Sequence, residues 1–271
     1  MRLCFDFDMQ TRRLPFNRWA ALLALMLVVS CGTVTETGRH QFNFMSSSQE
    51  MALGLTSFEK LKKETPINKD PAINALAQKV GKRIASVATL PGAQWEFVVF
   101  ESKEANAFCL PGGKVGIYTG ILPITKDEAG LAVVLGHEVA HATAHHGGER
   151  MSEAMAIQMG GQALGVGFSA ADPRMQAVAS LAYGTVTTLG RELPHSRAQE
   201  SEADYIGLLY MARAGYNPEE AVNFWTRFAE VNKQSGGGDL WFLRTHPLDE
   251  RRIQDIKAKL PKAKQEYRPQ N

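Results

Sequence analysis

The chain has 271 residues, 44% of them hydrophobic, and a formal net charge of +2 at pH 7. Such a length and composition can bury a core, and one main domain is expected. The nearly balanced charge excludes the strongly basic class of nucleic-acid-binding proteins, so no nucleic acid is expected as a partner.

Residues 1–30 are predicted to be a lipoprotein signal peptide. Arginines precede the apolar run "WAALLALMLVVSC", which is typical of a signal-peptide core and is short for a membrane span. The run ends with Ser30 and Cys31 in "VVSC", which resembles the lipobox cleaved in bacterial lipoproteins. Cys31 would then be the lipidated first residue. One alternative is that this segment is a membrane anchor that is not cleaved. The other is that the given sequence starts upstream of the true initiator methionine.

Gly32 follows the lipobox cysteine. In the lipoproteins that this motif resembles, Asp at that place tends to retain the protein in the inner membrane. Its absence favours the outer membrane, with the protein facing the periplasm and anchored by lipid on Cys31.

The chain has three cysteines, and Cys109 is expected to have no intramolecular partner. Cys4 lies in the signal peptide and Cys31 would carry lipid, so neither is left for a disulfide. Because free cysteines are usually buried, we interpret Cys109 as an apolar core residue rather than a reactive thiol.

The folded domain is expected to cover residues 49–261. Residues 31–48 are polar and without a hydrophobic period, so they are predicted to tether the domain to the membrane. Residues 262–271 are expected to form a polar tail.

Two helices are predicted at the start of the domain. Apolar residues from Ser48 to Leu61 suggest the first. The second, "NKDPAINALAQKVGKRIASVA", has Asp70 as a capping residue, Pro71 at the first helical position and an apolar stripe.

A small sheet is predicted next. "QWEFVVFES" is rich in aromatic and β-branched residues, as strands are. "ANAFCLPGGKVGIYTGIL" has a Pro-Gly-Gly turn between two strand-like runs and is predicted to be a hairpin.

The rest of the domain is predicted to be helical. A capping box from Thr125 to Glu128 begins a helix that runs through the histidines to Gly147 and Gly148. Residues 151–193 are predicted to form two helices and a loop. We interpret their apolar residues as part of the core, and a mobile lid over a cleft is the alternative. Ser196 and Asn217 are predicted to cap the next two helices, and "LDERRIQDIKAKL" is the last.

The motif "HEVAH" points to a metal site. His137 and His141 are four residues apart, so on a helix both imidazoles project from one face and can grip one ion. In such a zinc site Glu138 takes a proton from water and is not itself a ligand.

Catalytic zinc sites usually have a third protein ligand and leave one position for water. The stretch "ESEAD" places Glu200 and Asp204 one helical turn apart. Glu200 is the predicted third ligand, and Asp204 is expected to accept a hydrogen bond from a ligand imidazole. Without the histidine motif, these acids would be interpreted as a solvated helix face.

These motifs, with "NAFCLPGG" before and "RTHPLDERR" after, resemble the zinc metalloprotease family that includes HtpX, the CAAX prenyl endopeptidases and the periplasmic BepA and LoiP types. The resemblance covers about 67–260. It implies an α+β, mainly helical zincin-type fold with a small antiparallel sheet, one Zn²⁺ per chain, ligands His137, His141 and Glu200, and Glu138 as general base.

The resemblance also implies an edge strand that pairs with an extended substrate. The residues of that strand are Asn106, Ala107, Phe108, Cys109 and Leu110. It further implies a place near the metal for His246, either stabilising the oxyanion or binding the open zinc position, with Arg252 assisting by charge. A loop histidine that only caps the last helix is the alternative for His246.

Two features depart from the family pattern. His145 stands before His146 where relatives often have Arg, and both are interpreted as structural or surface residues. The chain after Leu260 has no room for the tetratricopeptide tail of BepA-type members, so the short LoiP-like form is the closer comparison.

The hypothesis that follows is a zinc-dependent endopeptidase of the bacterial envelope. By resemblance, its substrates are unfolded or misassembled envelope proteins, and outer-membrane assembly machinery is a further candidate partner. The rival is a periplasmic chaperone or assembly factor for outer-membrane proteins in which proteolysis is minor. A zinc enzyme outside proteolysis is disfavoured, because the strand-forming hairpin argues for a peptide substrate.

Overall fold

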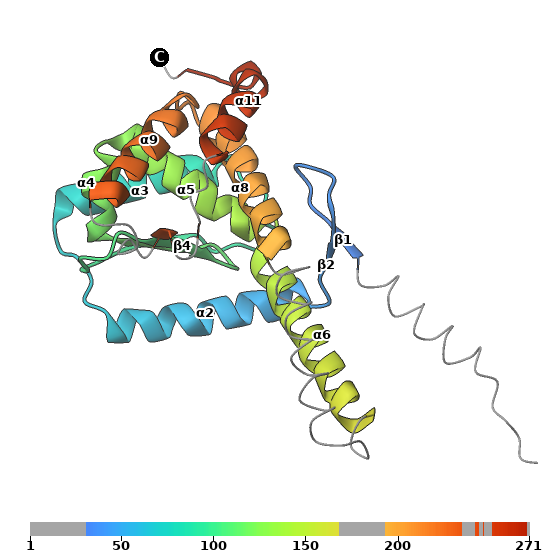
Figure 1. The fold of residues 1–271 in the computed structure, drawn as a ribbon. Coiled ribbons are helices and arrows are strands. Elements are labelled where there is room, and N and C mark those ends of the chain that lie inside the picture. Colours follow the sequence, from blue (N-terminus) through green and yellow to red (C-terminus); the bar gives the residue numbers. More distant parts are fainter. Residues whose placement is uncertain (1–30, 168–192, 235–241, 244–245, 247–250, 270–271) are drawn as a thin grey trace, which may run out of the picture.

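The computed structural model describes residues 31–167, 193–234, 242–243, 246 and 251–269 (Figure 1). A small sheet lies between helix α2 on one face and helices α3 and α5 on the other, and α8, α9 and α11 pack beyond α5 (Figure 1). The expected α+β, mainly helical class is confirmed. The signal-peptide prediction falls on residues 1–30, outside the described part of the chain.

The segment predicted as a tether contains ordered structure. Strands β1 (Cys31–Thr33) and β2 (His40–Phe42) pair antiparallel, and the side chains of Val34 and Gln41 are buried. The expectation of an irregular tether fails here because its polar side chains bond to distant helices, which no local period reveals. Helix α2 (Ser47–Glu64) follows.

Helices α2 and α3 follow their local signals. Ser46 and Gln49 form a capping box at the start of α2. In α3 (Pro71–Ala85), Asp70 accepts hydrogen bonds from two backbone amides of the first turn, as predicted.

The sheet contains the predicted hairpin. Strands β4 (Ala107–Leu110) and β5 (Lys114–Tyr118) pair antiparallel, and β3 (Glu96–Phe100) joins β5 in parallel. The strand order is β3-β5-β4, which leaves β4 at an edge. The expected sheet was antiparallel, and the parallel pairing of β3 with β5 is an addition to it. This pairing depends on the path of the chain between the two strands.

The histidine helix starts and ends at other residues than predicted. After a short helix, α4 (Leu122–Thr125), α5 runs over Glu128–Thr143 and is capped by Asp127, which accepts from Gly130 N. Thr125 instead donates to Leu122 O within α4. Because Lys126 has a φ of 65°, α4 ends there and the cap moves past Thr125.

The helix after the histidines breaks at His145, not at Gly147 and Gly148. His145 has a φ of 54°, a left-handed conformation that no α-helix continues through. Both glycines lie in the first turns of α6 (His146–Gly167). A Cβ on Gly148 would meet Glu50 Oε1 at 1.9 Å, so glycine is needed there for close approach rather than for a helix end.

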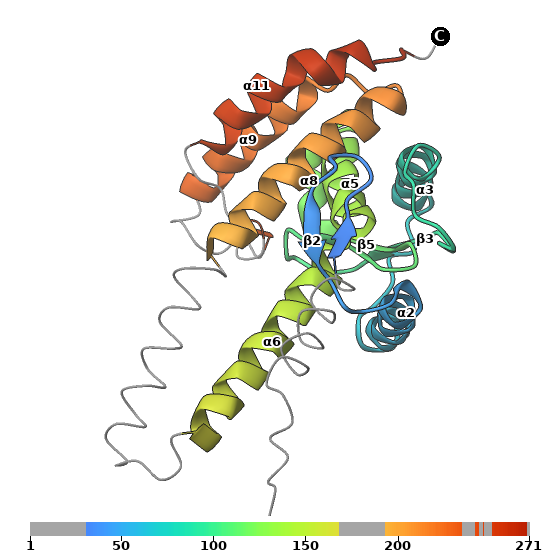
Figure 2. The same ribbon diagram turned by 90° about the vertical axis from the view of Figure 1, so that its right-hand side faces the viewer.

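Helix α6 extends away from the body, beyond the sheet (Figure 2). Its methionines Met151, Met155 and Met159 are 39%, 41% and 67% exposed. The interpretation of this stretch as core is therefore wrong for these methionines, because the helix has no described neighbour on that face. Most of the remaining span predicted with it, 168–192, lies outside the described residues.

Three helices complete the domain and lie side by side in Figure 2. They are α8 (Leu193–Arg213), α9 (Glu220–Gln234) and α11 (Arg252–Gln265). Ser196 lies inside α8, three residues past its start, rather than at its cap. Asn217 accepts from Glu219 N just before α9, as a capping residue does. In the part of the chain that the structure describes, no helix combines the length and apolarity that a membrane span requires.

Candidate metal centre

Helix α5 is the central element of the site. Its residues are buried from Gly130 to Thr143, because small and aliphatic side chains surround the two histidines on every face. Helix α8 crosses it closely at Gly136 and Gly207, where an added Cβ would lie 3.0 Å from backbone atoms of the other helix. This approach brings Glu200, two turns earlier on α8, to the histidines.

The three predicted ligands converge. His137 Nε2 and His141 Nε2 lie 3.1 Å apart. The Glu200 carboxylate spans both, with Oε2 3.2 Å from His137 Nε2 and Oε1 3.2 Å from His141 Nε2. The four-residue spacing and the downstream glutamate thus meet at one point, as expected.

His246 joins this cluster from the loop before α11. Its Nδ1 lies 2.9 Å from Glu200 Oε2 and 3.1 Å from His137 Nε2, and its Nε2 lies 3.3 Å from Glu138 Oε1. One ligand atom from each of His137, His141, Glu200 and His246 lies within 4.8 Å of the other three. The interpretation of His246 as a mere helix cap does not fit this position.

The donor set fits a metal ion. All four side chains are buried, and Glu200 Oε1 has no hydrogen-bond partner among the described residues. A buried carboxylate oxygen without a donor is costly unless a cation satisfies it. Imidazole nitrogens and a carboxylate are ligands that zinc accepts in catalytic sites.

Asp204 lies behind His137, as predicted. Its Oδ1 is 3.0 Å from His137 Nδ1, so it can hold the ring with Nε2 directed at the cluster. Arg252 donates to both oxygens of Asp204 at 2.9 Å and stacks 3.6 Å from the ring of Trp225.

Arg252 lies beside the cluster, with its Nη2 3.5 Å from His137 Nε2. Its guanidinium is buried against Asp204 and does not line the cavity described below. Its Nη2 is 3.5 Å from Glu200 Oε2, at the far side of the cluster from that cavity. A fork that bonds one carboxylate at both oxygens is suited to hold Asp204 in place.

Two further histidines bond to partners that the sequence did not reveal. His145 Nδ1 lies 2.8 Å from Glu50 Oε2 and is a structural residue, as expected. His146 is fully buried, with Nδ1 2.8 Å from His141 Nδ1 and Nε2 3.0 Å from Glu202 Oε2. Glu202 is the second glutamate of "ESEAD" and was therefore visible in the sequence. The spacing of residues could not predict that His146 is its partner.

The electrostatics follow from burial and pairing. Burial raises the pKa of Glu138, the direction that favours a general base at neutral pH. Burial opposes the charged form of Glu200, but the nearby His141 and the other histidines outweigh it and lower the pKa of Glu200. For Glu202, hydrogen bonds led by His146 outweigh burial and lower the pKa to about 2.

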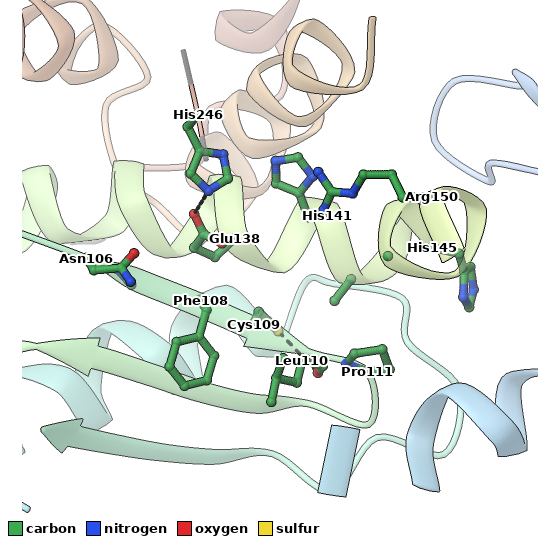
Figure 3. Close-up of a pocket in the computed structure, with 13 residues that line it drawn as sticks. Asn106, Phe108, Cys109, Leu110, Pro111, Glu138, His141, His145, Arg150 and His246 are labelled. Carbon is green, nitrogen blue, oxygen red and sulfur yellow. Dashed lines mark hydrogen bonds and ion pairs between the residues drawn. The ribbon is translucent and has the colours of Figure 1, made fainter. Parts of the chain in front are cut away.

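A cavity of about 430 Å³ opens beside the cluster. Figure 3 shows Glu138, His141 and His246 along one wall, on or above α5, and strand β4 along the other. All five residues of the predicted edge strand, 106–110, line it. The thiol of Cys109 is buried there, which raises its pKa and confirms the interpretation of an inert cysteine.

The register of the hairpin shows which peptide groups of β4 face outward. Tyr118 N donates to Asn106 O, so residues 106 and 118 form a hydrogen-bonded pair. Because such pairs alternate in an antiparallel ladder, the peptide groups of Ala107 and Cys109 point away from β5. They face the edge that borders the cavity.

Residues 71–260 match the model of peptidase family M48. The chain belongs to this family. The resemblance drawn from the motifs is confirmed, over nearly the span expected for it, and the protein is a metalloprotease.

Relatives come from mitochondria and from bacteria. The chain is 33% identical to the mitochondrial metalloendopeptidase OMA1 of Saccharomyces cerevisiae, over 84% of this chain and 69% of the relative. The corresponding values for OMA1 of Schizosaccharomyces pombe are 34%, 84% and 66%. For the beta-barrel assembly-enhancing protease of Escherichia coli they are 27%, 91% and 52%, so the chain spans about half of that protein.

Proposed function

We propose that this M48 metalloprotease is a zinc-dependent endopeptidase of the bacterial envelope that hydrolyses unfolded or misassembled proteins. The observation that carries the proposal is that the cluster of His137, His141 and Glu200 lies beside a cavity. Glu138 and His141 line one wall of this cavity, and an edge strand lines the other. Metal chemistry and a binding place for extended polypeptide thus meet within one cleft.

When bound, zinc supplies Lewis-acid chemistry by polarising the scissile carbonyl and making water more acidic. Glu138 accepts the proton of the attacking water and returns it to the departing amine, so no acyl-enzyme forms. Asp204 accepts from His137 Nδ1 and thereby leaves the Nε2 lone pair for the metal. Arg252 holds Asp204 and acts as a positioning residue.

An extended substrate is proposed to lie along β4. The outward peptide groups of Cys109 and the outward carbonyl of Ala107 can pair with its main chain, and such pairing tolerates many side chains. The amide of Ala107 already donates to Asn106 Oδ1 at 2.9 Å. Two peptide substrates can be compared that carry N-methyl groups at the odd or at the even residues on one side of the scissile bond. Only the peptide whose methyl groups block the amides that pair with β4 should show a raised KM. Equal KM values for both methylated peptides and for the unmodified peptide would contradict main-chain pairing.

Replacement of the base tests the mechanism. Glu138→Gln keeps the size of the side chain but cannot accept the proton, so cleavage of an unfolded protein should fall by about 10²–10⁴-fold. Zinc content should stay near one per chain, because the ligands are unchanged. Cleavage at the native rate would show that Glu138 is not the base.

Replacement of the carboxylate ligand tests the metal. Glu200→Ala removes an oxygen donor that spans both histidines, and zinc content after dialysis should fall. Asn106→Ala, on the opposite wall of the cavity, is the control and should keep its zinc. Undiminished zinc in Glu200→Ala would exclude this residue as third ligand.

Assembly of outer-membrane proteins is the second candidate function. It is favoured by the bacterial relatives, which are named beta-barrel assembly-enhancing proteases. Cells that contain only Glu138→Gln separate the two functions, because this variant keeps the cleft and loses hydrolysis. Rescue of envelope defects by Glu138→Gln would favour the assembly role, and failure to rescue would favour proteolysis.

A further inference from the structure

The loop between β1 and β2 makes a partly buried polar contact with helix α6 and with helix α8, which carries the proposed ligand Glu200. Arg39, at the end of this loop, forms a two-bond fork with Glu149 of α6, at 2.9 and 2.8 Å. Its Nε also donates to Glu202 Oε2 of α8 at 2.6 Å. Thr37, in the same loop, donates to the other oxygen of Glu202.

Glu202 continues this contact to the metal site. The oxygen that accepts from Arg39 also lies 3.0 Å from His146 Nε2. His146 Nδ1 in turn lies 2.8 Å from His141 Nδ1, and His141 Nε2 faces the cluster. Arg39, Glu202, His146 and His141 therefore form one hydrogen-bonded row, which we name the Arg39 relay.

The relay determines which nitrogen of His141 carries its proton. A carboxylate accepts, so His146 must donate to Glu202 from Nε2, and its Nδ1 is left with a lone pair. That lone pair accepts from His141 Nδ1, and the lone pair of His141 is then on Nε2, where a metal ligand needs it. With the other tautomer of His146, His141 would have its proton on Nε2 and could not bind the ion.

Arginine is suited to the first position of the row. Its planar fork bonds Glu149 at both oxygens while Nε remains for Glu202, so one side chain fixes two carboxylates from two helices. The inner members are shielded from water, since His146 is 0% exposed and Glu202 8%. The Arg39 side chain is 25% exposed, so Arg39 is the member of the row that lies nearest to solvent.

We propose that Arg39 is a positioning residue for the metal centre, acting through Glu202 and His146 on the orientation and tautomer of His141. Arg39 lies outside residues 71–260, the part of the chain that matches the family model. The segment that follows the predicted lipid anchor thus contributes directly to the metal site. The inference rests on the proposed identity of His141 as a metal ligand.

The test measures metal release from the full-length, zinc-loaded protein. Zn²⁺ release is followed as its transfer to an excess of a chromogenic zinc chelator, at a temperature well below the Tm of each variant. Arg39→Gln should release zinc roughly tenfold faster than the native protein, the lower end of the range for partners of metal ligands. Its kcat should fall while KM stays unchanged, because the substrate strand is not touched.

Arg213 provides the matched control. It bonds the same loop, donating to Glu36 at 2.9 Å, and it also pairs with Glu266, but the structure gives it no contact with the relay. Arg213→Gln should release zinc at the native rate. Arg39→Lys should recover part of the loss, because it keeps a charge beside Glu202 without the fork.

Two results would overturn the proposal. One is a native rate of zinc release from Arg39→Gln, and the other is an equal acceleration in Arg213→Gln, which would show that loop anchoring alone matters. A double variant, Arg39→Gln with Glu202→Gln, should release zinc no faster than Glu202→Gln, and additive effects would contradict a shared route. Failure of the native protein to bind zinc would instead overturn the proposed function.

Discussion

His246 is the residue whose position says most about regulation of the site. Its Nδ1 lies among the ligand atoms, 2.9 Å from Glu200 Oε2. A histidine that only stabilised the oxyanion would not need to lie this close to a ligand. A histidine placed there competes with water and substrate for the open coordination position.

We therefore expect His246→Ala to raise activity. If the imidazole occupies the fourth position in the resting state, its removal should raise kcat/KM on an unfolded protein roughly tenfold, equivalent to about 1.4 kcal/mol of competition. Zinc content should not change, since three ligands remain. A fall in kcat would instead indicate a role in the transition state, and an unchanged rate would exclude both.

His145 should make stability depend on pH. Its hydrogen bond to Glu50 raises the pKa of His145 above the ordinary value of 6.5. A raised pKa in the folded state means that the stabilisation is fully present below pH 6.5 and is lost as the pH rises through the folded pKa. The expected size is about 1 kcal/mol or less, because the side chain is partly exposed.

Urea unfolding of the zinc-loaded protein measures this effect. The difference in unfolding free energy between the native protein and His145→Gln should be larger at pH 6 than at pH 9. Glu50→Gln should show the same loss of pH dependence. An equal difference in unfolding free energy at both pH values would contradict a stabilising contact between protonated His145 and Glu50.

At the scale of elements, the crossing of α5 and α8 builds the site. Glu200 and Asp204 of α8 reach the histidines of α5 only because Gly136 and Gly207 let the two backbones approach. No side chain larger than hydrogen fits between them without a shift, so the distance between helices and the metal geometry are coupled.

Gly207→Ala should therefore damage both stability and metal binding. Its Cβ would lie 3.0 Å from His137 N, and the helices must separate to accept it. We expect a loss of about 1–3 kcal/mol in unfolding free energy and weaker zinc binding in competition with a chelator.

Gly147→Ala is the matched control for this change. An added Cβ at that helical glycine meets nothing within 4 Å, so stability should be unchanged or slightly raised. A native Tm and native zinc affinity for Gly207→Ala would show that the crossing tolerates separation.

At the scale of the whole molecule, the predicted lipid anchor begins the hairpin whose loop contains Arg39. Cys31 is the first residue of β1 and pairs with Phe42, so an anchor there would hold the β1–β2 hairpin close to the bilayer. The predicted location at a membrane depends on this one cysteine.

Cys31→Ser tests that location. In bacterial cells the native protein should incorporate labelled palmitate and sediment with membranes, and Cys31→Ser should do neither. Zinc content of the purified variant should stay native, because Cys31 is not a ligand. Labelling of Cys31→Ser, or an unlabelled native protein, would exclude lipidation at this residue.

Much of this protein could be predicted from local patterns. The spacing of His137 and His141, the cap at Asp70 and the β4–β5 hairpin depend on interactions within a few residues, which the order of side chains specifies. Asp204 could be predicted as well, because it lies one helical turn from Glu200. The family resemblance followed from the same short motifs.

Only the tertiary structure showed the Arg39 relay, the 2.9 Å contact of His246 with Glu200 and the exposed face of α6. Arg39 and Glu202 are 163 residues apart in the chain, and no spacing rule connects a loop arginine to one of several acids on a distant helix. The break at His145 likewise depends on packing, since Gly148 is needed beside Glu50 rather than at a helix end. The sequence by itself determined the chemistry of the ligands, because that chemistry is local. Packing decided which side chains hold those ligands in place, because burial and long-range contact exist only once the chain has folded.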